Sequence, residues 1–176
     1  MPEPAQWSAD DAVTRLFAAH YRSLVRLAHL LLADASVAEE IAQDAYVALH
    51  GRWRGLRDTD KALAYLRAVV VNRSRSALRH RRVVDRYVQG YAVTAPEANE
   101  NSPSAEADVL GRLGRAEMVA ALRQLPTRQR EALVLRYYGE LSEAEIADAM
   151  GCSRGAVKSH AARGLRALRS RTDGST

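Results

Sequence analysis

The sequence predicts an all-α protein made of two small helical domains joined by an acidic flexible linker. Apolar residues recur at three- and four-residue steps in both halves of the chain, and no stretch alternates as a half-buried strand does. With 176 residues, 47% of them hydrophobic, the chain can give each domain a core. Four acids, two prolines and no basic residue lie between the halves. We therefore expect domains over 1–88 and 110–176, with the linker over 89–109.

The first domain is expected to begin with two amphipathic helices. An apolar stripe at helical spacing covers residues 13–31 and is interrupted at Asp34. Ser36 is followed three residues later by Glu39, which is the spacing of a capping box. This pattern predicts a second helix from Ser36 to about Leu49.

A loop and a basic helix are predicted to complete the first domain. Residues 51–60 include two glycines and are expected to form the loop, which contains Trp53. A third helix is predicted from near Thr59, with Leu66 and Val70 on its buried side. Its outer side is rich in arginine and can follow a phosphate backbone, although a solvated charged face has the same composition.

The second domain is predicted to start near Leu110. Pro126 ends its first helix, and Thr127 is expected to cap the next one. Ser142 and Glu145 then have the capping-box spacing that begins a further helix.

The segment that follows this cap has the pattern of a helix-turn-helix. Ala147 supplies a small residue where two helices cross, Gly151 a turn residue that tolerates positive φ, and Val157 an apolar anchor in the second helix. Ser153 is predicted to cap that second helix, whose outer side can reach phosphates and base edges. The candidate DNA-binding residues are Ser153, Arg154, Lys158, Ser159, Arg163 and Arg166. A generic helical hairpin with a solvated basic face is the alternative.

Charge is unevenly distributed along the chain. The net charge of +5 hides seven acids against three arginines in residues 1–50. Seven arginines and one acid fall in 67–86, and five arginines, one lysine and no acid fall in 151–171. The two basic segments favour a polyanionic partner. The second predicted helix instead has an acidic stripe, which consists of Glu40, Gln43, Asp44 and Val47. Such a stripe fits the basic surface of a partner protein, although an ordinary solvated face has similar residues.

Several function classes are excluded by what the sequence lacks. A single cysteine, Cys152, rules out a disulfide framework and a zinc site of paired thiolates, and we expect neither a metal nor a cofactor. Phosphate-binding glycine loops and nucleophile motifs are missing, so we expect no enzyme. The N-terminus has no signal-peptide pattern, and no apolar run is long enough for a bilayer. We predict a cytoplasmic protein that does not insert into membranes.

Over 16–169, the chain resembles the extracytoplasmic-function class of bacterial RNA polymerase sigma factors. The segment LFAAHYRSLVRLAHLLLADASVAEEIAQDAYVAL is similar to regions 2.1 to 2.2 of that family, and ALAYLRAVVVNRSRSALRHRR to its region 2.4. The most specific match is to region 4, in LRQLPTRQREALVLRYYGELSEAEIADAMGCSRGAVKSHAARGLRALR, because LPxxxRExxxLRY precedes the helix-turn-helix. The segments VVVNRSRSALRHRR and LSEAEIADAMGCS are especially similar to those of actinobacterial members of the sigma-E type.

The resemblance implies an alternative sigma factor that binds core RNA polymerase and directs promoter-specific transcription initiation. The helix-turn-helix residues would recognise the minus-35 element of promoter DNA. The minus-10 element would be recognised and opened by Trp53, Tyr65, Asn72, Arg73, Arg75, Ser76 and Arg79. The acidic stripe would dock on the polymerase clamp. Leu133, Leu135, Tyr137 and Tyr138 lie where the family packs its core and meets the flap, and the sequence does not separate these two roles.

Three points stay open at the level of sequence. A helix-turn-helix regulator that is not a sigma subunit would need a receiver or ligand domain upstream, and no strand-rich half is predicted. An antagonist that mimics region 4 is a second alternative, against which the intact basic region 2.4 argues. Whether an anti-sigma factor is a further partner cannot be read from the sequence.

Overall fold

The computed structural model describes residues 3–89 and 114–173. Most of the predicted linker over 89–109, together with Leu110 and Leu113, therefore lies outside the described residues. Within the described ranges there are seven α-helices, one short 3-10 helix and no strand, so the all-α prediction is confirmed. The chain divides into two compact units, Met1–Val88 and Gln89–Thr176, called unit 1 and unit 2 below. Among the described helices, none is both long and apolar enough to span a bilayer.

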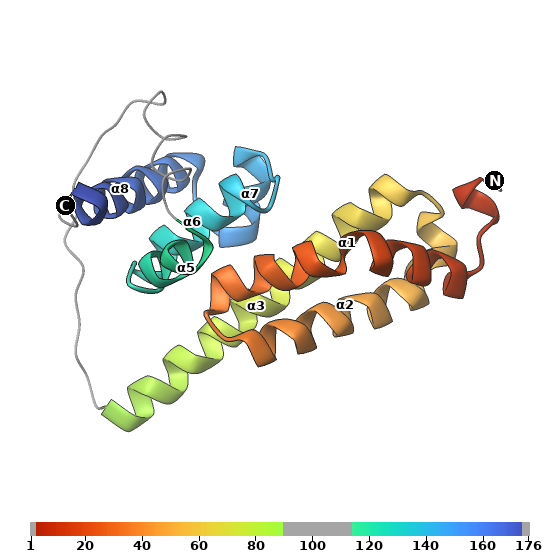
Figure 1. The fold of residues 1–176 in the computed structure, drawn as a ribbon, viewed down its shortest axis with the longest axis horizontal. Helices are drawn as coiled ribbons and strands as arrows, with labels where there is room; N and C mark the ends of the chain where they lie inside the picture. The colour runs from red at the N-terminus through yellow and green to blue at the C-terminus, as the bar shows by residue number, and fades with distance from the viewer. Residues whose placement is uncertain (1–2, 90–113, 174–176) are drawn as a thin grey trace. The chain divides into compact units, whose positions relative to one another are not determined.

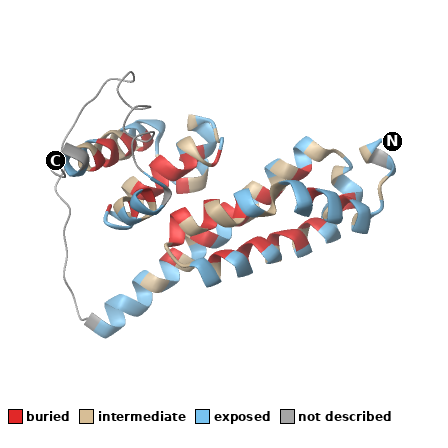
Figure 2. Cartoon of the chain, in the orientation of Figure 1, coloured by how far each residue is buried: buried red, intermediate tan, exposed pale blue. Residues whose placement is uncertain are grey.

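Unit 1 contains three long helices (Figure 1). Helix α1 (Ala9–Leu32) packs along α2 (Ala35–Leu56), which runs in the opposite direction, and α3 (Thr59–Gln89) returns beside them. The largest fully buried side chains of this unit belong to all three helices: Leu24, Leu31, Leu49, Leu66, Val70 and Val71. Burial along α3 ends at Leu78, and residues 82–88 are exposed where the helix extends beyond its neighbours (Figure 2).

The cap of α2 differs from the predicted one. Asp34, not Ser36, is the N-cap, because its Oδ1 accepts a hydrogen bond from the Val37 amide at 3.1 Å. Only Ala33, at φ 55°, and Asp34 separate α1 from α2, so the chain has already turned before Ser36. The capping box predicted from Ser36 and Glu39 is wrong, since both residues lie inside the helix.

The predicted loop over 51–60 is also wrong, because α2 continues through both glycines to Leu56. Trp53 is the reason: its indole is only 2% exposed, and its Nε1–H donates to the Trp7 carbonyl oxygen at 2.9 Å. The two indoles stack with centroids 6.4 Å apart. Burying so large a ring contributes roughly 2–3 kcal/mol, which offsets the cost of about 1 kcal/mol for each helical glycine.

Four shorter helices surround a second core in the described part of unit 2, residues 114–173 (Figure 1). Helix α8 (Arg154–Asp173) packs against α5 (Arg115–Arg123), α6 (Thr127–Tyr137) and α7 (Glu143–Met150). The fully buried side chains of this unit include Leu122, Leu133, Leu135, Ile146, Met150 and Leu168. The N-cap of α6 is Pro126, so Thr127 begins the helix instead of capping it.

One glycine sets the distance between α6 and α8. A Cβ added to Gly164 would lie 2.7 Å from Leu133 Cδ1 and 3.1 Å from its Cγ. The Leu133 side chain is 1% exposed, so it has little room to move away. The sequence pattern assigned the small-residue role to Ala147, which is indeed buried, but it missed Gly164.

Candidate nucleic-acid and protein interfaces

Local signals build the helix-turn-helix of unit 2 as the sequence predicted. Ser142 Oγ accepts from the Glu145 amide and the Glu145 carboxylate accepts from the Ser142 amide, so the capping box of α7 is confirmed. The hydrogen bond from the Ser142 amide to the ionised carboxylate, followed by the interaction with the Ser142 side chain, lowers the pKa of Glu145. Gly151 ends α7 with φ 61°, and Ser153 Oγ accepts from the Ala156 amide to start α8.

Arg128 of α6 holds the turn between α7 and α8 in place. Arg128 Nη1 donates to the Met150 carbonyl oxygen at 2.7 Å and lies 3.6 Å from Glu131 Oε2. The Glu131 side chain is almost fully buried. The Arg128 guanidinium thus joins α6 to the end of α7, and the acid in the LPxxxRExxxLRY pattern belongs to the core of unit 2.

Helix α8 has one buried side and one outward side. Val157, the predicted apolar anchor, is buried, and so are Ala161, Leu165 and Leu168. At about 100° per residue, Ser159, Arg163 and Arg166 fall on the opposite side of the helix. By the same spacing Arg154, the first residue of the helix, lies on the side of Ala161 and Leu165, and Lys158 lies at the edge of that side; both are nevertheless exposed.

The two cations at the start of α8 meet an acid from α7. Glu143 Oε1 lies 3.3 Å from Arg154 Nε and 3.9 Å from Lys158 Nζ. The Glu143 side chain is 29% exposed, whereas Arg154 and Lys158 are 68% exposed. This acid was not among the residues singled out from the sequence, because only the fold brings it to the basic surface.

Helix α3 carries the second predicted DNA-binding set. Asn72, Ser76 and Arg79 are exposed and follow each other at four and three residues, so they share one face. Tyr65, half-buried, lies on the same face two turns earlier. Arg79 Nη2 donates to Ser76 Oγ at 3.1 Å, which holds part of this face together.

The same face extends further along α3 than the sequence analysis proposed. Arg82 and Arg86 follow Arg79 at three and seven residues and are exposed. Helical periodicity was the signal that could have identified them. Arg75, half-buried, lies at the edge of this face.

Arg73 and Trp53 are placed differently from the rest of the predicted set. Arg73 points toward α2, where its Nη1 donates to Asp44 Oδ2 at 2.6 Å. This ion pair joins a residue of the predicted DNA surface to one of the predicted docking stripe, and both side chains are about half exposed. Trp53, expected on a loop, lies in the core, where its indole is covered.

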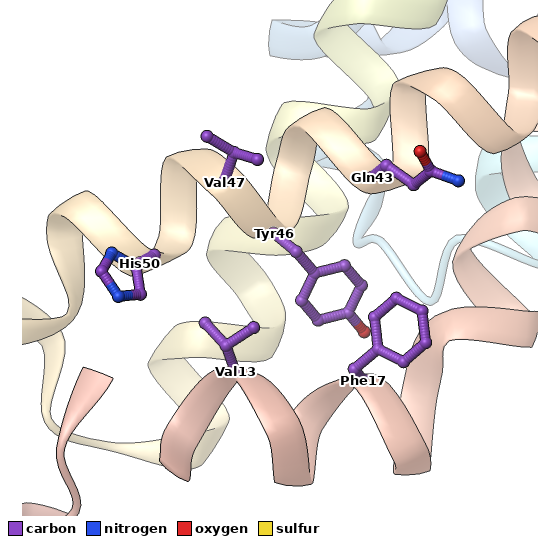
Figure 3. Close-up of a pocket in the computed structure, with 6 residues that line it drawn as sticks. All are labelled: Val13, Phe17, Gln43, Tyr46, Val47 and His50. Carbon is purple, nitrogen blue, oxygen red and sulfur yellow. The ribbon is translucent and has the colours of Figure 1, made fainter. Parts of the chain in front are cut away.

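The outward side of α2 lies beside a shallow apolar groove. Figure 3 shows Val13 and Phe17 of α1 opposite Tyr46 of α2, with the predicted residues Gln43 and Val47 on the same rim. Val47 is 74% exposed and Phe17 is 41% exposed.

Ring contacts and hydrogen bonds hold this groove in shape. Phe17 stacks on Tyr21 with centroids 4.2 Å apart, and Gln43 Nε2 donates to Tyr21 Oη at 3.4 Å. Tyr46 Oη donates to the Leu16 carbonyl oxygen at 2.9 Å, and burial raises the pKa of its phenol. Phe17 belongs to the apolar stripe predicted over 13–31, and the groove beside it was not predicted, because the two walls of the groove come from different helices.

The remaining predicted contact residues can now be separated from the core. Leu133 and Leu135 are buried, whereas Tyr137 and Tyr138 at the end of α6 are half-buried. Glu40 is exposed on α2. Core packing thus belongs to the two leucines, and both tyrosines reach the surface.

Two family models match the chain in the order expected from its two units. Residues 16–83 match Sigma-70 region 2, and residues 115–168 match Sigma-70, region 4. The first match covers most of the three-helix unit, and the second runs from the start of α5 into α8. Together they cover more than half of the 176 residues.

Relatives from several bacteria match across both units. The RNA polymerase sigma-E factor of Streptomyces avermitilis is 34% identical over 84% of this chain and 77% of its own length. That of Streptomyces coelicolor is 33% identical over 84% and 78%. The RNA polymerase sigma factor CarQ of Myxococcus xanthus is 30% identical over 92% and 89%.

A solved structure has the same fold. It is the sigma factor RpoE of Bartonella quintana, in complex with the anti-sigma factor NepR, with a TM-score of 0.64 and 21% identity over 93% of this chain and 98% of that one. The fold, both family matches and the sequence relatives agree with the sigma factor class expected from the sequence. Sigma factors are specificity subunits without enzymatic activity of their own, and this applies to the present chain as a member of the family. The protein belongs to the extracytoplasmic-function sigma factors, the alternative sigma factors that direct transcription initiation.

Proposed function

We propose that this sigma factor recognises the minus-35 promoter element through the start and outer side of α8. The observation that carries the proposal is the helix-turn-helix itself, whose second helix exposes cations and contains no acid before Asp173. In this motif the N-terminal residues of the second helix contact base edges in the major groove. Phosphate and base contacts are assigned to Ser153, Arg154, Lys158, Ser159, Arg163 and Arg166.

The minus-10 element is assigned to the outward face of α3. Asn72 and Ser76 are exposed groups that can hydrogen-bond to bases, and Arg79 beside them can contact phosphate. Tyr65 offers a ring on the same face, where an unstacked base can lie. Arg73 reaches DNA only when it leaves Asp44. Trp53 is buried, so it is proposed to support this surface only indirectly, by packing in the core of unit 1. Arg75 lies at the edge of the outward face of α3.

Core RNA polymerase is proposed to dock on the outward side of α2. Glu40, Gln43 and Val47 offer an acid, an amide and an apolar group on consecutive turns, next to the groove of Figure 3. Asp44 belongs to this side but is engaged with Arg73. A basic surface of the clamp with one protruding apolar side chain fits this arrangement. Tyr137 and Tyr138 are proposed to meet the flap.

The domain boundaries and location follow from the same proposal. A region 2 domain over 1–88 is supported by the compact unit that ends at Val88. The linker over 89–109 and the region 4 domain over 110–176 stay as predicted. Because its partners are core polymerase and promoter DNA, we place the protein in the cytoplasm. An anti-sigma partner of the kind that binds Bartonella RpoE is tested by co-purification with the tagged full chain.

In vitro transcription with core polymerase tests the assignment of α8. The full chain and core enzyme are given genomic fragments, and start sites are mapped. Arg154→Ala and Lys158→Ala should each lower initiation at these promoters by roughly 5- to 50-fold, as loss of one base or phosphate contact does. Binding to core polymerase should be unchanged. Loss of core binding by either variant would contradict the assignment of α8 to DNA.

A second measurement tests the docking surface. Val47 is so exposed that Val47→Glu should leave unit 1 folded, and it should weaken core polymerase binding about tenfold, as loss of an interface anchor does. Val84→Glu is the control, since Val84 is an exposed valine on α3 outside this surface. Equal core affinity of the two variants would count against docking at α2.

A further inference from the structure

We infer that Glu143 is a positioning residue for minus-35 recognition, which holds Arg154 in the orientation that reads a base. The inference rests on the proposed function of α8. It adds a residue of α7 that belongs to none of the assigned contact sets. Its basis is the contact of one carboxylate oxygen, Oε1, with the cations Arg154 and Lys158.

The atom that Glu143 contacts is the first argument. Oε1 lies 3.3 Å from Arg154 Nε, the guanidinium nitrogen nearest the aliphatic part of the side chain. An ion pair through Nε does not require the end-on edge, which is formed by the two Nη groups. That fork is the one that pairs with O6 and N7 of guanine. A carboxylate on Nε restricts the rotation of the guanidinium and keeps its fork directed away from α7.

Electrostatics at the start of α8 give the second argument. Arg154 and Lys158 are four residues apart in the first turns of the helix, where like charges repel and the helix dipole disfavours cations. The side chain of Glu143 is less exposed than either cation, so it forms the fixed side of the cluster. Without this acid, two long side chains at the N-terminus of α8 would spread into solvent.

The position of the acid also affects discrimination between DNA sequences. A carboxylate near the DNA backbone disfavours contacts that depend on phosphate charge alone. A correctly oriented Arg154 gains a base contact that offsets this penalty only on the matching sequence. Glu143 should thus increase the preference for the correct base pair while reducing affinity for arbitrary DNA.

The experiment measures base preference with the holoenzyme. The strongest promoter found by start-site mapping is rebuilt with its minus-35 element randomised, and transcripts are sequenced. Wild type, Glu143→Gln, Arg154→Ala and Asp148→Asn are compared, each as the full chain with core polymerase. Asp148→Asn is the matched control, because it removes an exposed acid from the same helix. The ion pairs of Arg154 and Lys158 are with Glu143 and do not involve Asp148.

Glu143→Gln should lower the preference for the correct base about fivefold, at the same base pair of the minus-35 element that depends on Arg154. This factor is the lower end of the discrimination that one bidentate contact gives. Asp148→Asn should keep the wild-type profile, and thermal unfolding should show both variants folded. If Arg154→Ala changes the profile and Glu143→Gln does not, or if Asp148→Asn flattens it equally, the positioning role is overturned while the function of α8 stands. If Arg154→Ala changes nothing, the assignment of α8 fails, and the positioning role fails with it.

Discussion

Replacing Gly164 by alanine should destabilise unit 2, although alanine is the better helix former. The gain in helix propensity is about 1 kcal/mol. Against it stands a new Cβ at 2.7 Å from Leu133 Cδ1, well inside the 3.5–4.0 Å optimum for carbon atoms. Because Leu133 is fully buried, α6 and α8 must separate, and overpacking of this kind costs about 1–3 kcal/mol. We expect a net loss of about 1 kcal/mol in the free energy of unfolding.

Gly155 provides the matched control within the same helix. An added Cβ there meets only Ser153 Oγ, at 3.9 Å, so Gly155→Ala should be neutral or stabilising by up to about 1 kcal/mol. The two variants should therefore differ by about 1–2 kcal/mol, or roughly 4–16 °C in the Tm of a unit of this size.

Two optical signals separate the units in a urea titration of the full chain. The chain has two tryptophans, Trp7 and Trp53, and both lie in unit 1, so tryptophan fluorescence follows that unit alone. Circular dichroism at the helix band follows both units. Gly164→Ala should move only the dichroism transition. If Gly164→Ala proved as stable as Gly155→Ala, or if the fluorescence transition moved with it, the argument from the α6–α8 contact would be refuted.

Three further variants test the core and the pKa shifts. Trp53→Phe should lower the unfolding free energy of unit 1 by about 1–3 kcal/mol, measured with urea, because it loses volume and the bond to Trp7; unchanged stability would place the indole outside the core. Burial raises the pKa of Tyr46, so its stabilisation is present below pH ~10 and is lost above it. In Tyr46→Phe, the unfolding free energy of unit 1 should therefore fall less above pH ~10 than it does in wild type. Equal losses in the two proteins would contradict this role of Tyr46. Burial, followed by Arg163 and Arg128, lowers the pKa of His160, so its contribution is present above about pH 6.5 and is lost as the pH falls. The unfolding free energy of His160→Asn should vary less than that of wild type between pH 7 and 5, and equal variation would exclude this role.

The helix-turn-helix could be predicted closely because its signals are local. A capping box at Ser142, a left-handed glycine at Gly151 and a cap at Ser153 each act within three residues along the chain. The apolar spacing of α8 then determines which side is buried, and so which residues face outward. The buried side of α8 could therefore be predicted from the sequence, while the DNA contacts on its exposed residues stay a prediction.

The errors occurred where distant parts of the chain decide the outcome. Two glycines indicated a loop around Trp53, but a carbonyl 46 positions earlier accepts its indole hydrogen and keeps α2 helical. The buried Glu131 looked like any surface acid in the sequence, and the approach of Gly164 to Leu133 depends on how two helices cross. Local propensity does not encode such contacts, so tertiary packing overrides it.

The ion pair between Asp44 and Arg73 changes how the acidic and basic surfaces of unit 1 should be tested. Both side chains are about half exposed, so the pair contributes at most about 1 kcal/mol, and a phosphate could replace the carboxylate at small cost. Reversing the charge of Asp44 would therefore weaken a docking contact and also release a cation toward DNA. A loss of transcription in that variant would not identify the affected step. Val47 lies on the same side of α2 and takes no part in this ion pair, and for this reason it separates polymerase docking from promoter binding where the acid does not.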